Sequence, residues 1–187
     1  MKKAGTRWTP GDGRFRRTLA VFSLSAASTR GLVRLGNLNF PCALGRSGRR
    51  ALKREGDGAS PRGAFRVVQA FYRSDRQRRP RTGVPIRPLR ANDGWCDSVN
   101  DRNYNRLVAH PYPASAERMW RHDHLYDLVV VLDHNQRPRV RGLGSAIFMH
   151  VASADHAPTA GCIALSPRDL RHVLERLARG VRILIGQ

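Results

Sequence analysis

Hydrophobic residues along this chain occur in short runs whose length and spacing predict β-strands. Residues 125–132 form a nearly continuous apolar run, typical of a buried strand, and the polar residues 133–136 after it favour a turn. Residues 146–149 form a second apolar run, which ends at His150. Residues 65–72 are rich in β-branched and aromatic side chains. These three runs predict strands, the first two of them in the core.

The N-terminal half adds a strand and a hairpin. Residues 19–24 form a short apolar run, which we interpret as the first strand. Gly36 and Asn37 lie between the runs 32–35 and 38–40, and a pair of this kind closes two-residue hairpins. The sequence thus predicts two antiparallel strands joined at that pair.

One helix is predicted, at residues 166–179. Ser166 suits the N-cap and Pro167 suits the first helical position. An apolar stripe with helical spacing follows, at Leu170, Val173, Leu174 and Leu177. Gly180 then ends the helix, and residues 181–185 return as a terminal strand. The predicted fold class is therefore mostly β (α+β), with one C-terminal amphipathic helix and a terminal strand.

Length and composition indicate a folded domain with a strong positive charge. The chain has 187 residues, 41% of them hydrophobic, which is enough for one domain with a real core. We expect residues 1–17 to be a basic, flexible segment and residues 18–187 to form the single domain. The 34 Lys and Arg residues against 14 Asp and Glu give a net charge of +20. Such a charge favours nucleic acid, an anionic membrane or an anionic polymer as partner, unless GC-rich codons account for the arginines.

Two long segments are predicted to be loops. Residues 45–63 are glycine-rich, and they lack the Gly-Lys-Ser/Thr ending of a phosphate-binding loop. Residues 73–94 contain seven arginines and three prolines. We interpret that segment as a solvated loop, with contact to a polyanion as the alternative.

No integral membrane segment is predicted, and no signal peptide is convincing. No stretch reaches the roughly 20 apolar residues of a membrane-spanning helix. Residues 14–28 superficially resemble a signal peptide, because basic residues precede an apolar stretch. That stretch is short and diluted by serines, so we prefer a strand there.

The three cysteines, Cys42, Cys96 and Cys162, form no zinc-ligand set, and we predict neither a metal nor another cofactor. If Cys162 has a separate role, the other two remain as a pair that an oxidising compartment can bridge. Cys42 lies in an apolar stretch, for which a buried thiol is the favoured interpretation.

His150 and Cys162 are the strongest candidates for a reaction centre. A thiol becomes a strong nucleophile when a nearby imidazole takes its proton. Gly161 allows a tight turn together with Thr159 and Ala160, so that backbone N–H groups can face an oxyanion. The pattern predicts a cysteine acyl-transfer site. The alternative is an inert core cysteine beside an ordinary surface histidine.

His150, Thr159, Gly161 and Cys162 resemble the signature of the L,D-transpeptidase (YkuD-type) catalytic domain, which is His, a variable loop and then Ser/Thr-x-Gly-Cys. Papain-like peptidases place the cysteine ahead of the histidine, so the order of the two residues supports the resemblance. Weaker similarity lies upstream, at residues 45–48, 53–65, 95–105 and 125–135.

The resemblance implies an L,D-transpeptidase-like β-sandwich or barrel in which Cys162 is the nucleophile and His150 the base. It also implies peptidoglycan stem peptides as substrate and the cell envelope or periplasm as location. In that family a backbone carbonyl next to the histidine orients the ring, which by match lies at Val151. We further expect Tyr126 and His124 to line the cleft, because we place them on a strand beside His150.

Two departures from the family pattern leave the substrate contacts open. Val151 stands where the family often has Gly, and Ala164 stands at a substrate-binding position where it often has Arg or Asn. Two alternatives to transpeptidation also remain. One is an L,D-carboxypeptidase on the same scaffold, in which water takes the acyl group. The other is a non-catalytic basic domain that binds a polyanion; nucleic acid is a less favoured partner, although the charge does not exclude it.

Overall fold

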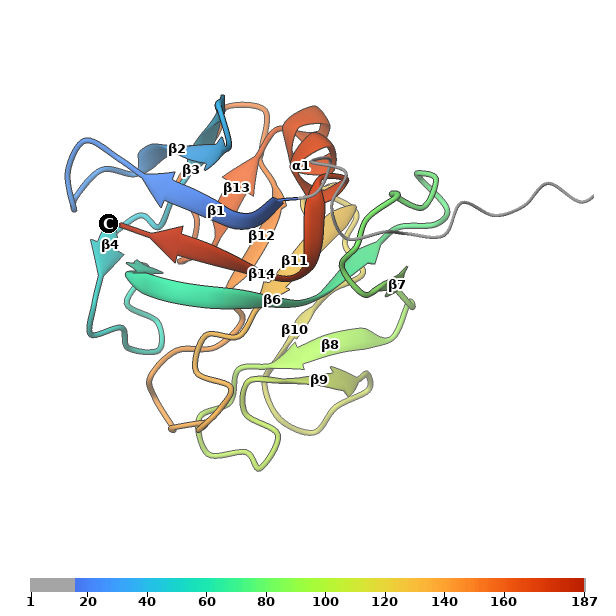
Figure 1. Ribbon diagram of the computed structural model, residues 1–187. Coiled ribbons are helices and arrows are strands. Elements are labelled where there is room, and N and C mark those ends of the chain that lie inside the picture. The colour runs from blue at the N-terminus through green and yellow to red at the C-terminus, as the bar shows by residue number, and fades with distance from the viewer. Residues whose placement is uncertain (1–15, 187) are drawn as a thin grey trace, which may run out of the picture.

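Strands dominate the computed structural model, which describes residues 16–186 (Figure 1). The predicted class, mostly β with one C-terminal helix, is confirmed. In chain order the elements are β1 (Arg16–Phe22), β2 (Arg30–Leu35), β3 (Leu38–Ala43), β4 (Arg49–Arg50), β5 (Ser60–Pro61), β6 (Gly63–Tyr72), β7 (Ile86–Pro88), β8 (Asp93–Cys96), β9 (Arg106–Ala109), β10 (Ala116–Arg118), β11 (Leu128–Leu132), β12 (Phe148–Val151), β13 (Ile163–Leu165), α1 (Pro167–Leu174) and β14 (Leu177–Ile185).

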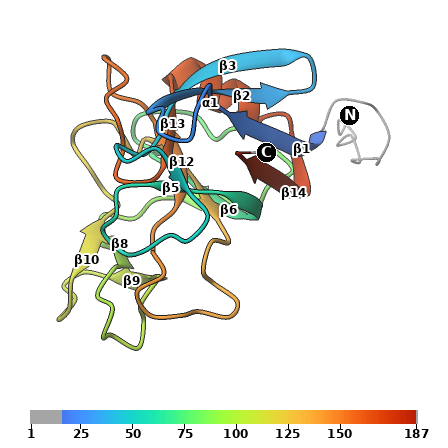
Figure 2. The same ribbon diagram turned by 90° about the vertical axis from the view of Figure 1, so that its left-hand side faces the viewer.

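Eight of the strands close into a barrel. Their order is β11-β12-β13-β3-β2-β1-β14-β6, and pairing of β11 with β6 completes the ring, while β7 extends the sheet beyond β6. Most neighbours are antiparallel, but β1 with β14, β12 with β13 and β6 with β7 are parallel. A separate sheet of β10, β8 and β9 lies beside the barrel (Figures 1 and 2).

The two faces of the barrel wall carry two separate hydrophobic clusters. Side chains alternate between faces along a strand. Val130 and Met149 therefore join the cluster that fills the barrel, to which all eight barrel strands and α1 contribute. Val129 and Phe148 belong to the second cluster, together with Trp95 of β8. The outer face of β11 and β12 is thus covered by the small sheet.

Most of the predicted strands are confirmed. β2 and β3 form the hairpin across residues 36–37. β1 overlaps the strand predicted at 19–24 and pairs with both β2 and β14, so the strand interpretation is confirmed there. β6 contains residues 65–72. Of the segment predicted to be flexible, residues 1–15 lie outside the described residues, and the last two belong to β1.

The C-terminal helix is shorter than predicted. α1 ends at Leu174, and Leu177 begins β14 instead of completing the helical stripe. The stripe was ambiguous because Leu177 is buried in either arrangement. β14 pairs with β1 and β6 and runs through Gly180, whose φ of 74° falls at a register shift against β1. Long-range pairing thus outweighs the local helical preference.

The prediction of a solvated loop at residues 73–94 is wrong where β7 and the start of β8 form strands and where Arg73 is buried. The Arg73 side chain is only 4% exposed, and its guanidinium carbon lies 3.7 Å from the ring centroid of Trp120. Arginines of the segment form three ion pairs: Arg73 with Asp75, Arg76 with Asp127 and Arg87 with Asp93. Trp120 and Asp127 are far away in the chain, so the local pattern did not reveal them.

Candidate active site

Alternation along two neighbouring strands brings His150 and Cys162 to the same face of the barrel wall. β12 and β13 are parallel, and His150 pairs with Ala164. Cys162 lies two residues before Ala164 and so emerges on the same side. Adjacent strands are about 4.8 Å apart, so the backbone ladder itself keeps the two side chains near each other. Both belong to the outer face, the one that the small sheet covers.

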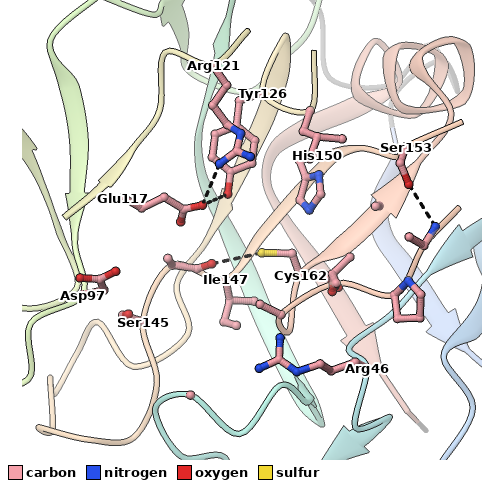
Figure 3. A pocket seen from close by; sticks show the side chains of 18 of the residues that line it. Arg46, Asp97, Glu117, Arg121, Tyr126, Ser145, Ile147, His150, Ser153 and Cys162 are labelled. Atoms are coloured by element: carbon pink, nitrogen blue, oxygen red, sulfur yellow. Dashed lines mark hydrogen bonds and ion pairs between the residues drawn. The ribbon is translucent and has the colours of Figure 1, made fainter. Parts of the chain in front are cut away.

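A cavity of about 620 Å³ opens on this face, and both His150 and Cys162 line it (Figure 3). Its charged lining residues are three basic and three acidic, namely Arg46, Lys53, Arg121, Glu55, Asp97 and Glu117. This balance contrasts with the +20 charge of the whole chain. The cavity therefore suits a ligand with charges of both signs better than it suits a uniform polyanion.

One backbone contact sets the protonation pattern of His150. Its Nδ1 lies 2.8 Å from the carbonyl oxygen of Val151, so Nδ1–H donates and Nε2 keeps a free lone pair. The ring is 7% exposed, and the edge of Tyr126 packs on it with ring centroids 5.4 Å apart. Burial lowers the pKa of His150 to about 4. The imidazole is thus neutral and able to accept a proton near neutral pH.

The thiol of Cys162 is held by backbone groups rather than by the imidazole. Sγ–H donates to the carbonyl oxygen of Ala146 at 3.2 Å (Figure 3), and Sγ accepts from the N–H of Phe148 at 3.4 Å. Within residues 16–186, no hydrogen bond joins Sγ to His150. Burial raises the pKa of the thiol to about 12, and the charge of Glu117 adds to the rise. The resting pair is therefore a neutral thiol and a neutral imidazole.

The turn before Cys162 is built around Gly161 and Thr159. Gly161 has a φ of 137°, and a Cβ there would stand 2.8 Å from the carbonyl oxygen of Ala59. Thr159 Oγ1 accepts from the Gly161 N–H at 3.1 Å and donates to the Cys162 carbonyl at 2.7 Å. Ala160 is exposed at the cavity wall. The Gly161 N–H, which we expected to face an oxyanion, is engaged by Thr159 in this state.

Of the further residues predicted to line the cleft, two do so and one does not. Tyr126 lines the cavity, but from the turn before β11 rather than from the strand, and Ala164 lines it from β13. His124 lies outside the cavity lining: its side chain is 68% exposed, and its Nδ1 lies 2.8 Å from Asp127 Oδ2. The chain turns sharply at His124, where φ is 66°, and a turn does not follow strand alternation.

Comparison with known families identifies the domain. A family model of the L,D-transpeptidase catalytic domain, YkuD, matches residues 18–185. The chain belongs to the YkuD family. No curated protein and no solved structure gives a significant match. Proteins of the YkuD family are L,D-transpeptidases that act on peptidoglycan, and they are typically associated with the cell envelope.

In the described part of the chain, no helix is both long enough and apolar enough to cross a membrane. Among residues 16–186, no group of three or more His, Cys, Asp or Glu side chains is arranged to hold a metal ion. The three cysteines are all free and buried, so Cys42 and Cys96 do not bridge in this structure.

Sequence reasoning missed Lys53, which lies buried behind the Gly161 turn. Its Nζ forms an ion pair with Asp57 at 2.7 Å, and the two side chains are 5% and 8% exposed. Nζ would lie 3.3 Å from a Cβ on Gly161, and its charge lowers the pKa of Cys162. The signal available in the sequence was the close spacing of opposite charges in a glycine-rich turn, at Lys53 and Asp57.

Sequence reasoning also missed the acidic side of the cavity in this YkuD domain. Glu117 lines the cavity and accepts a hydrogen bond from the Tyr126 hydroxyl at 2.5 Å. Burial raises its pKa above the ordinary value. β10 carries Glu117 to the cavity because it pairs with β8, which lies against the barrel wall. No local sequence pattern marks such a long-range placement.

Proposed function

We propose that this YkuD domain is a cysteine acyltransferase acting on peptidoglycan stem peptides, with Cys162 as nucleophile and His150 as base. The observation that carries the proposal is the bond from His150 Nδ1–H to the Val151 carbonyl, because it leaves Nε2 as a proton acceptor in the cavity that Cys162 lines. Family membership supports peptidoglycan as the substrate.

The first half of the reaction is attack of the thiol on a stem-peptide amide. The Cys162 side chain turns from the Ala146 carbonyl toward His150, and Nε2 takes the proton from Sγ. The thiolate adds to the carbonyl carbon, the C–N bond breaks, and the imidazolium returns its proton to the leaving amine of D-alanine. A thioester on Cys162 remains, and an amine or water then resolves it.

The electrostatics of the cavity favour the neutral pair at rest. Desolvation keeps both His150 and Cys162 neutral at rest, because it disfavours either charged form. Once the thiolate and imidazolium form together, each stabilises the other, and the buried Lys53 adds positive charge nearby. The N–H of Cys162, with that of Gly161 once Thr159 releases it, is the proposed oxyanion donor.

The domain division and the location belong to the same proposal. Residues 18–187 would form one catalytic domain, which agrees with the family match over residues 18–185. The cell envelope or periplasm is the expected location, because proteins of the family act on peptidoglycan. The balanced charge of the cavity gives no specific support to a non-catalytic polyanion-binding role.

The decisive experiment is to weigh the intact protein after incubation with tetrapeptide-bearing muropeptides. We expect a mass increase equal to the donor acyl group, with release of D-alanine, in the wild type and none in Cys162→Ser or His150→Gln. An unmodified wild-type protein that leaves the muropeptides unchanged would overturn the proposal.

A further inference from the structure

Exposed apolar side chains of this protein are concentrated on three loops. Five large hydrophobic side chains are exposed in the described part of the chain, and three of them lie on these loops. Leu24, between β1 and β2, is fully exposed, Leu52, between β4 and β5, is 85% exposed, and Val140, between β11 and β12, is 45% exposed. An exposed apolar side chain is ordinary when it stands alone, so the arrangement of the loops decides whether these three act together.

The three loops adjoin one another. β4 lies against the β1–β2 loop, because Arg49 donates from its backbone N–H to the carbonyl of Ala26 at 2.7 Å and from its guanidinium to that of Ser25 at 3.2 Å. The β4–β5 loop in turn meets the β11–β12 loop, where the Glu55 N–H donates to the Gly142 carbonyl at 2.8 Å. In Figure 1 the β1–β2 loop and β4 lie together at the left-hand side of the molecule, which faces the viewer in Figure 2. The loops therefore form one surface, the three-loop surface, made of residues 23–29, 51–59 and 137–143.

Exposed arginines surround the apolar side chains of the three-loop surface. Residues 18–54 contain seven Lys and Arg residues and no Asp or Glu. Within residues 16–186, none of the four arginines nearest in the chain to Leu52 and Val140 forms an ion pair. These four are all exposed, and they are Arg50, Arg54, Arg137 and Arg141.

The carboxylates of the β4–β5 loop are engaged inside the molecule. Glu55 lines the cavity and accepts a hydrogen bond from the Tyr104 hydroxyl, and Asp57 is 8% exposed and pairs with Lys53. The other two loops of the surface contain no Asp or Glu. The three-loop surface is therefore positive, whereas the charges that line the cavity are balanced.

An anionic lipid bilayer is the partner that uses both the charge and the apolar side chains of this surface. Its phosphates attract arginines that lie close to the headgroups, and each such arginine raises the affinity about fivefold. Apolar side chains that enter the boundary between headgroups and acyl chains are removed from water. A nucleic acid or a dissolved anionic polymer would pair with the arginines but leave Leu24 and Leu52 in water. The combination therefore favours a membrane over the other two polyanions.

We propose that the three-loop surface docks the domain on an anionic phospholipid bilayer, with Leu24, Leu52 and Val140 entering the lipid and the flanking arginines on the phosphates. Three short side chains bury much less apolar surface than a spanning helix does, so the docking is peripheral and reversible. The β4–β5 loop also contributes Lys53 and Glu55 to the cavity lining, so docking holds the cavity beside the bilayer. The three apolar side chains lie outside that lining, and docking does not depend on the proposed reaction.

Flotation with lipid vesicles tests the docking. The protein is mixed with vesicles of phosphatidylcholine alone or with about one-third phosphatidylglycerol, and the bound fraction is measured against lipid concentration. We expect saturable binding to the anionic vesicles and little binding to the neutral ones. A protein that does not float with the anionic vesicles would overturn the proposal.

The apolar side chains are tested one at a time. Leu24→Gln and Leu52→Gln should each weaken binding to anionic vesicles about tenfold, because the inserted apolar surface is lost. Leu38→Gln is the matched control, since Leu38 is 46% exposed at the start of β3, while the other end of β3 pairs with Arg30 beside the β1–β2 loop. It should bind as the wild type does. Undiminished binding by both loop variants would mean that charge alone holds the protein, and would replace the bilayer by a dissolved polyanion.

The charges are tested in pairs. Arg50→Gln with Arg54→Gln should weaken binding roughly 30-fold, about fivefold for each charge. Arg79→Gln with Arg81→Gln removes the same charge from an exposed segment beside the start of β14, to which Gly83 hydrogen-bonds, at the opposite end of the barrel. That control should weaken binding by less than about twofold, because salt screens distant charges. Equal losses in the two pairs would show that net charge rather than the three-loop surface binds lipid.

A fluorophore at position 24 reports insertion directly. Leu24→Cys labelled with an environment-sensitive dye should shift its emission to shorter wavelength on anionic vesicles, and labelled Leu38→Cys should not. The three native cysteines are buried, and the wild type labelled in parallel gives the background. Bound protein with unshifted emission would overturn insertion. Soluble muropeptides should acylate the glutamine variants as they do the wild type, and a wild type that is never acylated would overturn the proposed function but not the docking.

Discussion

Cys42 and Cys162 lie on or beside neighbouring strands, yet only one of them has the surroundings of a nucleophile. Cys42 pairs with Leu165 of β13, and its side chain belongs to the cluster inside the barrel. Cys162 precedes β13 and faces the cavity on the outer side. Burial raises the pKa of both thiols to about 12, so acidity does not separate them.

What separates the two thiols is the access of a proton acceptor and a substrate. Cys162 shares a cavity with the Nε2 lone pair of His150, whereas Cys42 is 2% exposed and packs among aliphatic side chains. A thiol held neutral by burial becomes reactive only where a base and a carbonyl carbon can reach it together. The location of a cysteine relative to the barrel wall therefore predicts its role better than its pKa does.

The largest expected effect comes from exchanging each cysteine for alanine. Cys162→Ala should reduce acylation by roughly 10⁴-fold or more, because the attacking atom is lost. Cys42→Ala should leave the rate within about threefold and cost only about 1 kcal/mol of stability, through a small cavity in the core. Mass measurement of the acyl-enzyme tests the acylation rates, and urea unfolding tests the stability. A Cys42→Ala variant that folds but has lost its activity would contradict the comparison.

A second test removes the buried charge behind Cys162. Lys53→Met should cost about 3–5 kcal/mol of stability, because Asp57 is left buried and unpaired. It should also slow alkylation of Cys162, since the charge of Lys53 opposes the rise that burial causes in the pKa of that thiol. Alkylation of Cys42 in urea serves as the reference rate. The double variant Lys53→Met with Asp57→Asn should recover stability but not reactivity, and recovery of both would contradict a role for the charge.

The third test uses pH. His150 has a pKa of about 4 when folded and 6.5 ordinarily, so between those values the unfolded chain binds a proton that the folded protein does not. The free energy of unfolding should therefore fall by about 3 kcal/mol as the pH drops from 6.5 to 4. Urea unfolding at several pH values measures this slope. His150→Gln should lose that part of the slope, while Cys42→Ala should keep it.

The smallest expected effect comes from replacing the glycine beside each cysteine by alanine. A Cβ on Gly31, which pairs with Cys42, would stand 2.5 Å from the Phe22 carbonyl oxygen, and one on Gly161 would stand 2.8 Å from that of Ala59. Gly31→Ala and Gly161→Ala should each cost about 1–3 kcal/mol in thermal unfolding. Only Gly161→Ala should also slow acylation. Equal losses of activity would mean that the turn has no special role.

Much of the fold and the centre of the candidate site could be predicted from the sequence. The apolar runs predicted the strands, and the motif predicted His150 at the end of a strand and Cys162 in a glycine turn, because both signals are local. The helix end at Leu174 could not be predicted in this way, since Leu177 is buried in a helix or in β14 alike.

The walls of the cavity were not predictable because they come from distant segments. Lys53 approaches Gly161 from the loop between β4 and β5, and Glu117 lies on a strand of the small sheet. Neither residue lies at a sequence spacing or periodic position from which its proximity to Cys162 could be predicted. His124 shows the opposite error, in which strand alternation was assumed for a residue that lies in a turn. Local patterns thus located the candidate pair His150 and Cys162 but not its electrostatic surroundings.

The position of β14 in the ring has a consequence for how the protein is made. β14 ends at Ile185 and hydrogen-bonds to both β1 and β6, so the ring stays open until the last strand is available. A nascent chain on the ribosome would therefore hold two unpaired strand edges, those of β1 and β6, until β14 emerges. Closure of the barrel is then a late step in folding, because it joins segments that are far apart in the described chain.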